Sequence, residues 1–508
     1  MSNNKRIAKN TLFLYFRMFL IMGVSLYISR VVLETLGVDD FGIYNVVGGI
    51  VTMFSFINGS LGSATSRYIT FELGKKDYSK LNQIFNVAFV VHVFIAVIIV
   101  ILAETVGLWF FYEKMVIPED RISAAFWVYQ ISILTSFFSM TQVPYNAVII
   151  ARENMKVYAY VGIFEVLAKL LIVYMIKFSP IDTLIYYALL LCVLQITILL
   201  YYRYFCTSRY QESHLKICKD KTLYKSIFTY AGSDMIGAVS VMAQGQGLNL
   251  LLNVYFGPVV NAARAIAYQV QGAVTQFSNN FMTAVRPQII KSYAQGDTDD
   301  MWRLVIQSSC FSFYLMFLIC LPIMLETDTI LSLWLGEYPE HTVPFLRLVL
   351  VLCLIQTVKT PRVTIFHAMA KVFWSNITVG IVLCMVFPLA YLFLRLGYSP
   401  ESVFWAANIT MVLSEFVSVF VLRHFIDFSI CNYFLQVHGR CILVTIVASI
   451  VPYLVFDKFM EPGLIRLAMT CMISFVSVGL VSLFLGMDAQ LRHKLMEMVY
   501  SKIGTKHD

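Results

Sequence analysis

The stretch NVYFGPVVNAARAIAYQVQGAV, residues 253–274, contains a break at Gly257 and Pro258 and then an apolar run that carries one charged residue, Arg264. A Gly-Pro pair is typical of a turn, so the chain is expected to reverse direction here between two helices. The second helix is apolar enough to lie in a membrane, where an arginine is costly and usually serves a function. The position of Arg264 therefore guides the interpretation of the whole chain.

Long apolar runs recur along the 508 residues, which are 59% hydrophobic and 13% charged; soluble domains are about 25% charged. A run of about 20 residues crosses a hydrocarbon core of roughly 30 Å as a helix. The predicted fold class is an all-α polytopic membrane protein with about fourteen transmembrane helices. The expected spans are residues 11–32, 40–65, 84–112, 122–148, 158–178, 181–205, 226–256, 259–285, 303–327, 342–370, 373–397, 400–424, 440–458 and 461–485.

Basic residues collect in alternate loops, and Lys and Arg are retained on the cytoplasmic side of a membrane. With the N-terminus inside, the basic segments KRIAK, RENMK and RPQIIKSYAQGD are cytoplasmic, while the loop 325–341 on the opposite side is acidic. Both termini are therefore expected in the cytoplasm, and the first span is expected to be an uncleaved helix. The formal charge of +8 follows from this asymmetry and from buried bases, so no nucleic-acid partner is expected.

The chain lacks the motifs of several enzyme and cofactor classes. Its ten cysteines stand singly, without a Cys-x-x-Cys pair or a histidine cluster, so we expect no disulfide and no metal site. A phosphate-binding Gly-x-x-x-x-Gly-Lys-Ser/Thr loop is missing, which argues against ATP hydrolysis. We expect no cofactor and no catalytic residues, and a transporter driven by an ion or substrate gradient.

Two halves of the chain resemble each other weakly. Gly37 and Gly257 each close a hairpin, Arg67 and Arg286 each end the next helix, and further matches follow at Pro144 with Pro361 and at Lys156 with Lys371. An even number of helices separates the pairs, so the predicted pseudo-two-fold axis lies along the membrane normal. The predicted domains are six-helix bundles at 1–215 and 216–430, with two further helices and a tail at 431–508. Chance similarity is the alternative.

Polar side chains form a stripe at helical spacing on the span that contains Arg264. Its members are Arg264, Tyr268, Gln271, Thr275, Asn279, Met282 and Arg286, and the preceding span carries Gln246, Asn249 and Asn253. Such a stripe is expected to face a cavity between bundles. The alternative for the amides is contact between helices, and for Arg264 it is an extended side chain that reaches the membrane surface.

Other charges also fall within the predicted spans. Arg17 and Arg30 lie about 220° apart around one helix, so only one can face a cavity, and Arg30 is preferred. Lys359 has no acidic neighbour in sequence and is a cavity candidate. A cavity lined by such bases selects an anion, because a guanidinium binds phosphate through two parallel hydrogen bonds.

Acidic residues at membrane depth are candidates for ion coupling. Glu165 and Lys169 are spaced to pair with each other, either as a structural ion pair or as a pair that opens for Glu165 to take up a proton. Asp234 lies near the start of its span, and Glu415 lies within another.

Three segments resemble bacterial polysaccharide flippases of the Wzx type, in the superfamily (MOP) that also holds MATE exporters and the lipid II flippase MurJ. They are SRVVLETLGVDDFGIYNVVGGIVTMF, PYNAVIIARENM and the region from Asn249 to Asp297. The resemblance implies flipping of an undecaprenyl-pyrophosphate-linked oligosaccharide, such as an O-antigen or capsule unit, across the bacterial inner membrane. It also implies pyrophosphate-binding arginines on helices 1, 2 and 8; Arg30 and Arg264 match two of these, but helix 2 has no base before Arg67. Helices 13 and 14 would form a groove for the lipid tail.

These observations give a set of residue roles. Arg30 and Arg264 are expected to hold the diphosphate, Lys359 to line the cavity, and four polar side chains to face the glycan: Gln246, Asn249, Tyr268 and Gln271. The ion-coupling candidates are Glu165, Lys169 and Asp234. The expected partners are the polyprenyl-linked glycan, membrane lipid and a polysaccharide polymerase.

Two other classes of membrane protein would share part of this sequence pattern. A MATE-type exporter of small organic molecules would share the architecture but would need an essential acid in its cavity. A membrane glycosyltransferase or polymerase would need a large outer loop, and the longest outer loop expected here has about 20 residues.

Overall fold

The computed structural model describes residues 3–53, 78–152, 154–216, 220–225, 242–369, 371–456 and 463–487, with the single positions 62, 65, 68, 69, 72, 73, 239, 240 and 492. Among these residues the regular structure is entirely helical. Helices suit the apolar sequence because they satisfy every backbone polar group within one segment, as a membrane requires.

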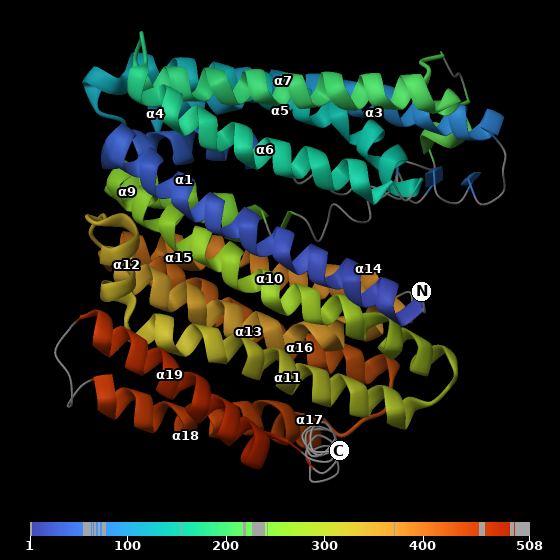
Figure 1. Cartoon of the computed structure of the whole chain (residues 1–508), viewed down its shortest axis with the longest axis vertical. Coiled ribbons are helices and arrows are strands. Elements are labelled where there is room, and N and C mark those ends of the chain that lie inside the picture. The colour runs from blue at the N-terminus through green and yellow to red at the C-terminus, as the bar shows by residue number, and fades with distance from the viewer. Residues whose placement is uncertain are drawn as a thin grey trace, which may run out of the picture. The chain divides into compact units, whose positions relative to one another are not determined.

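The helices follow one another along the chain (Figure 1). The α-helices are α1 (Asn3–Met53), α3 (Tyr78–Leu102), α4 (Leu108–Glu113), α5 (Ile122–Ala151), α6 (Met155–Met175), α7 (Thr183–Arg209), α9 (Leu248–Phe256), α10 (Pro258–Ala294), α11 (Thr298–Leu325), α12 (Thr327–Leu335), α13 (Thr342–Ala368), α14 (Val372–Cys384), α15 (Val386–Arg395), α16 (Ser402–Phe425), α17 (Ile430–Phe434), α18 (Arg440–Leu454) and α19 (Leu464–Val481). π-helical turns occur at Ala103–Gly107, Ala243–Gly247, Leu435–Gly439 and Ser482–Gly486.

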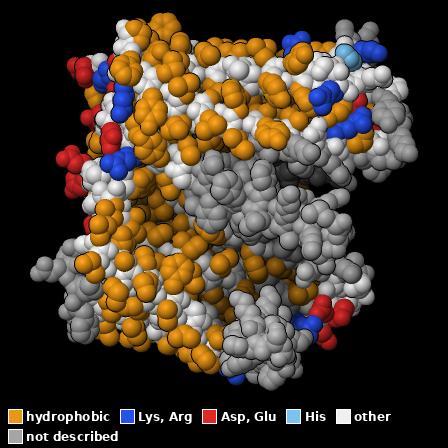
Figure 2. Space-filling model, in the orientation of Figure 1, with side chains coloured by type: hydrophobic (Ala, Val, Ile, Leu, Met, Phe, Trp, Pro, Cys, Tyr) orange, Lys and Arg blue, Asp and Glu red, His pale blue; other side chains and the backbone are white. Residues whose placement is uncertain are grey.

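Within the described residues, nine helical segments are long and apolar enough to span a membrane. They correspond to nine of the fourteen expected spans, the first being Ser79–Glu113 and the last Leu464–Gly486. The full number of fourteen and the symmetry between the halves stay predictions. Figure 2 shows the matching surface: hydrophobic side chains cover the middle of the helices in view, and charged side chains gather toward their ends.

The two glycines expected to close hairpins share an unusual backbone conformation. Gly37 has φ 79° and ψ 172°, at a kink inside α1, and Gly257 has φ 78° and ψ −171°, between α9 and α10. Only glycine adopts such angles without steric cost. The same residue with the same backbone geometry therefore stands at both positions that the repeat equates.

The chain separates into two compact units. The first contains residues 1–265 and 386–403, and its core holds Ile43, Val128 and Tyr129 where α1, α5 and the turn after α3 pack together. The second contains residues 266–385 and 404–508, in which α11 packs against α13, α18 and α19. The division into six-helix bundles at 1–215 and 216–430 stays a prediction.

The predicted start of the span at residues 440–458 was wrong, and the expected span 259–285 continues as α10 to Ala294. The expected loop DFSICNYFLQVHGR is largely helical, because the span begins at Ile430 and continues through the π-helical turn Leu435–Gly439 into α18. Ser429 caps its start by accepting a hydrogen bond from the backbone N–H of Asn432 at 3.3 Å. His438 in this segment lies 3.3 Å from Glu415 of α16, and this tertiary contact was not visible in the sequence.

Candidate functional site

A pocket of about 260 Å³ lies in the second unit between α10, α11 and α13, and is called the polar pocket below. Its lining consists mainly of hydroxyl and amide side chains and includes no charged residue. The lining residues are Tyr268, Gln271, Gly272, Thr275, Ser278, Asn279, Met316, Cys353, Gln356, Thr357 and Thr360.

The polar pocket presents many hydrogen-bonding groups in a small space. Thr275 donates its hydroxyl proton to the carbonyl of Gln271 at 2.8 Å, and Thr357 donates to Cys353 at 2.8 Å. A threonine bonded in this way keeps its oxygen as an acceptor, while each glutamine amide offers both donors and an acceptor. The pocket is therefore suited to a ligand rich in hydroxyl groups.

The α10 wall of this pocket is the polar stripe expected from the sequence, from Tyr268 to Asn279. The ring of Tyr268 also packs near Phe404, with centroids 6.4 Å apart. The α13 wall was not expected. Gln356, Thr357 and Thr360 recur at helical spacing in a predicted span, and this pattern is the signal that could have identified them.

Arg264 is buried in the first unit, with 6% of its surface exposed. Its Nη2 donates to the carbonyl of Gly245 at 2.5 Å. Gly245 lies in the π-helical turn Ala243–Gly247, and such turns disturb the regular backbone hydrogen bonding and often mark functional sites. The side chain of Arg264 thus reaches a backbone carbonyl of the π-helical turn that precedes α9.

The amides expected to face a glycan before Gly257 lie in a buried network of the first unit. Asn249 is 2% exposed and donates to the carbonyl of Asn45 at 3.3 Å and to Gln246 at 3.4 Å. Asn261 donates to the carbonyl and side chain of Asn249 at 2.7 and 2.8 Å. In this structure Asn249 therefore links α9 to α1 and to α10.

The remaining bases of the predicted site have partners on their own or a neighbouring helix. Arg30 is half exposed and its Nε donates to Glu34 at 2.9 Å, one turn further along α1. Lys359 on α13 donates to the hydroxyl of Ser414 on α16 at 3.1 Å. The structure does not bring Lys359 into the lining of the polar pocket.

Two of the three ion-coupling candidates form a pair. Lys169 donates to Glu165 at 2.6 Å on α6, and both side chains are about 40% exposed. This is the geometry expected of the structural ion pair. Asp234 lies outside the described residues.

A second cavity in the second unit is large and mostly apolar. It has a volume of about 960 Å³ and is lined by side chains of α11, α13, α16 and the segment from Phe434 to Phe456, among them Phe317, Leu354 and Ile446. Its lining also includes the charged side chains Arg347 and Glu415 and the imidazole of His438. We call it the apolar groove.

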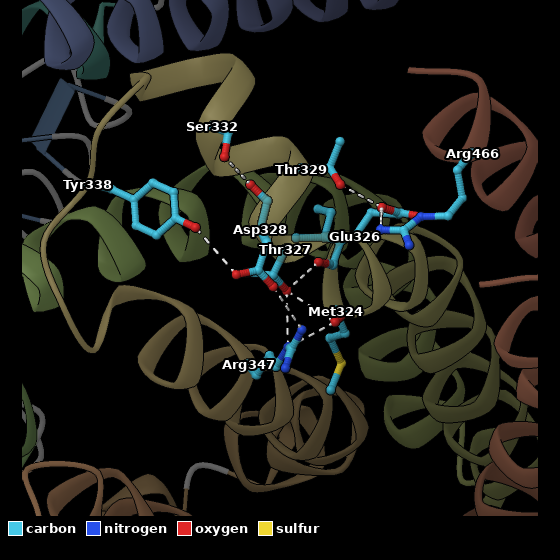
Figure 3. Close-up of polar contacts among 10 residues, drawn as sticks. Met324, Glu326, Thr327, Asp328, Thr329, Ser332, Tyr338, Arg347 and Arg466 are labelled. Carbon is cyan, nitrogen blue, oxygen red and sulfur yellow. Dashed lines mark hydrogen bonds and ion pairs between the residues drawn. The ribbon is translucent and has the colours of Figure 1, made fainter. Parts of the chain in front are cut away.

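Near one end of this groove, ion pairs hold α12 and α19 to the helices around them (Figure 3). Arg466 of α19 binds Glu326 through two hydrogen bonds, of 2.8 and 3.0 Å. Arg347 donates to the carbonyl of Met324 at 3.0 Å and lies 3.4 Å from the carboxylate of Asp328. The sequence indicated an acidic loop here but not the partners of its carboxylates.

Comparison with known proteins identifies the fold. A family model described as MatE matches residues 14–175. No curated protein matches the chain by sequence. The structure of the lipid II flippase MurJ in an inward closed conformation superposes with a TM-score of 0.70 at 11% identity, covering 93% of this chain and 98% of that one.

Two transporters of the MOP superfamily also share the fold. An inward-facing multidrug resistance MATE family transporter superposes with a TM-score of 0.65 at 10% identity, covering 79% of this chain and 94% of its own. A transporter from Pyrococcus furiosus, described as having a binding pocket of reverse polarity, gives 0.59 at 13% identity, with coverage of 80% and 94%. The chain has the fold of MOP superfamily transporters, and the MatE match supports membership of that superfamily.

Proposed function

We propose that this transporter-fold chain flips an undecaprenyl-pyrophosphate-linked oligosaccharide from the cytoplasmic to the periplasmic leaflet of the bacterial inner membrane. The substrate would be a repeat unit of O-antigen or capsule, moved by alternating access and coupled to an ion gradient. Such a substrate has three chemically different parts, which are a sugar chain, a diphosphate and an apolar tail. Each part requires a different kind of binding surface.

The polar pocket carries the proposal. Its hydroxyl and amide lining offers donors and acceptors for sugar hydroxyls and contains no carboxylate that would attract an organic cation. Tyr268 adds an aromatic ring of the kind that packs against the apolar face of a sugar. Tyr268, Gln271 and Gln356 are the residues we assign to glycan contact.

The diphosphate requires bases at membrane depth. Arg264 is the best candidate because a guanidinium matches a phosphate group with paired hydrogen bonds and stays charged when buried. In the described conformation it is oriented by the carbonyl of Gly245. Arg30 would contribute after exchanging Glu34 for the phosphate, which costs little because an exposed pair is weak.

The apolar groove supplies a surface for the lipid tail. A volume of about 960 Å³ lined by aliphatic and aromatic side chains fits a chain of hydrocarbon units better than a polar solute. The likeness to MurJ, which spans 93% of this chain compared with 79% for the MATE transporter, favours a lipid-linked substrate.

Export of small organic molecules is the second candidate, favoured by the MatE family model at residues 14–175. It requires an acid that couples substrate to cations. Glu415 is the described acid that best meets this requirement, because it is buried and lines the apolar groove.

The test is made on lipid-linked sugars. The gene is deleted and complemented with wild type, Arg264→Ala or Arg395→Ala, the last being a control that removes an exposed arginine of α15 outside the polar stripe. Undecaprenyl-pyrophosphate oligosaccharide facing the cytoplasm and surface polysaccharide are quantified at equal protein levels. The proposal expects the lipid to accumulate in the deletion and in Arg264→Ala, and to clear with Arg395→Ala. Unchanged lipid with increased sensitivity to cationic drugs would establish the exporter instead.

A further inference from the structure

The second unit contains a buried cluster of charges that the proposed transport site does not use. Arg362 of α13 is fully buried and donates to Glu415 of α16 and, at 2.6 Å, to the hydroxyl of Ser418. One carboxylate oxygen of Glu415, Oε2, is thereby satisfied by a permanent cation. A membrane protein keeps such a cluster only where it is paired and usually where it serves a function.

The other carboxylate oxygen faces an imidazole. Glu415 Oε1 lies 3.3 Å from Nε2 of His438. Both atoms are buried, and neither makes a hydrogen bond of acceptable geometry with any described residue. Two buried polar atoms at this separation are costly when unsatisfied. A proton held between them would satisfy both at once.

His438 lies in a segment that lines the apolar groove. It belongs to the π-helical turn Leu435–Gly439, which joins α17 to α18. The apolar groove has α11, α13 and α16 on one side and the segment with His438 and α18 on the other, and both Glu415 and His438 line it. The contact between these two residues therefore joins the two walls of the groove.

We propose that Glu415 and His438 form a proton-binding site that controls the width of the apolar groove. With the proton bound, the imidazolium pairs with the carboxylate and draws the α18 wall toward α16. Without it, the imidazole is neutral, its attraction to the carboxylate falls to that of one N–H···O hydrogen bond, and the walls separate enough to admit water or a ligand. The proposal does not rest on the flippase function, because it concerns the groove whatever occupies it.

Charged groups on neighbouring helices both favour and oppose a proton at this site. Glu415 favours the charged imidazole, while Lys359 and Arg362 of α13 oppose it through like charge. The other titratable or charged groups near the cluster are Cys310 and Tyr314 of α11, Tyr433 of α17, and Arg440 and Cys441 of α18. Imidazole is the side-chain type among these that ordinarily changes charge between about pH 5 and 8.

The distance between the walls can be measured by electron paramagnetic resonance in lipid nanodiscs. Spin labels are placed at the exposed positions Phe420 of α16 and Leu443 of α18, on a genetically encoded amino acid so that the native cysteines are retained. Between about pH 8 and about pH 5.5 we expect the mean distance to shorten by about 2 Å, the size of a typical helix shift. If the distance between the two labels does not change with pH in protein that is otherwise wild type, the proposal is overturned.

Two variants test whether the pH dependence of the distance arises from Glu415 and His438. His438→Gln is expected to abolish the pH dependence of the distance, and Glu415→Gln is expected to do the same while keeping the imidazole. His424→Gln removes an exposed histidine of α16 and is expected to leave the response intact. A pH response that survives either His438→Gln or Glu415→Gln, in protein that elutes as a single species, would show that the proton binds elsewhere.

Discussion

Arg264 of α10 donates a hydrogen bond of 2.5 Å to the carbonyl of Gly245, which belongs to a π-helical turn of the preceding span. The bond joins the guanidinium of Arg264 to the backbone of a neighbouring helical segment. Arg264 is therefore positioned by the fold before any substrate is considered. Its structural and proposed functional roles can be separated by conservative substitution.

Arg264→Lys is expected to keep the fold and lose transport. A lysine retains the positive charge and one donor, but it cannot present the paired donors that a phosphate requires. We expect thermal stability within about 1 kcal/mol of wild type, and a loss for Arg264→Ala of about 1–3 kcal/mol because the carbonyl of Gly245 loses its partner. Thermal unfolding and the lipid-linked sugar assay, run on both variants, check this. Full transport by Arg264→Lys would contradict a phosphate-binding role.

Gln271→Leu is expected to weaken substrate binding with little effect on stability. The side chain lines the polar pocket, and a lost hydrogen bond of about 1–2 kcal/mol corresponds to roughly a tenfold change in affinity. The matched control is Gln276→Leu, which makes the same change at an exposed position of α10 outside the pocket. The measurement is flipping of the lipid-linked oligosaccharide in reconstituted vesicles. Equal losses in both variants would argue against glycan contact at Gln271.

Arg466→Ala is expected to destabilise the second unit strongly. The change leaves Glu326, which is 1% exposed, without the guanidinium that binds it bidentately, and an uncompensated buried charge costs about 3–5 kcal/mol. Removing both charges with Glu326→Gln and Arg466→Met should cost less than the single change. Arg423→Ala breaks an exposed pair and should cost less than about 1 kcal/mol. Thermal unfolding of purified protein distinguishes these cases.

Gly42→Ala is expected to disturb the packing of the two hairpins in the first unit. A Cβ at position 42 would lie 2.1 Å from the carbonyl oxygen of Pro258, whereas a Cβ at Gly48 in the same helix would meet nothing within 4 Å. Overpacking of this kind costs about 1–3 kcal/mol. The alanine variants at 42 and 48 form a matched pair for thermal unfolding, and equal stability of the two would show that the close approach does not persist.

Asp182 is expected to give the first unit a stability component that depends on pH. It stands just before α7, accepts backbone hydrogen bonds from Leu184 and Ile185, and binds Arg121 at 2.7 Å. Burial raises the pKa of this carboxyl, but Arg121 and the two N–H groups outweigh it, so the pKa lies below the ordinary 3.8. A lowered pKa stabilises the fold above the ordinary value, and this stabilisation is lost as the pH falls through the folded-state pKa.

Asp182→Asn tests this contribution because it removes the charge and keeps the helix cap. The variant should melt below wild type at neutral pH, and the difference should shrink as the pH falls below about 4. Melting temperatures recorded across that range check the sign. A difference that grows on acidification would contradict the assignment.

Much of this protein was predictable because helices in membranes are local structures. Apolar runs predicted the nine segments that are long and apolar enough to span a membrane among the described residues. The glycines at 37 and 257 marked turns that only glycine forms easily, and the spacing from Tyr268 to Asn279 predicted side chains that line one wall of the polar pocket. Helical periodicity decides which side chains share a face, and it can be read from neighbouring residues alone.

The tertiary structure decided which faces meet. Asn249 contacts α1 and α10 through the carbonyl of Asn45 and the side chain of Asn261, and His438, which fell outside the expected spans, faces Glu415. Arg466 and Glu326 are 140 residues apart, and nothing local pairs them. The sequence determined the helices, their faces and the charges they carry; packing alone determined the partner of each charge, because partners come from helices distant in the chain.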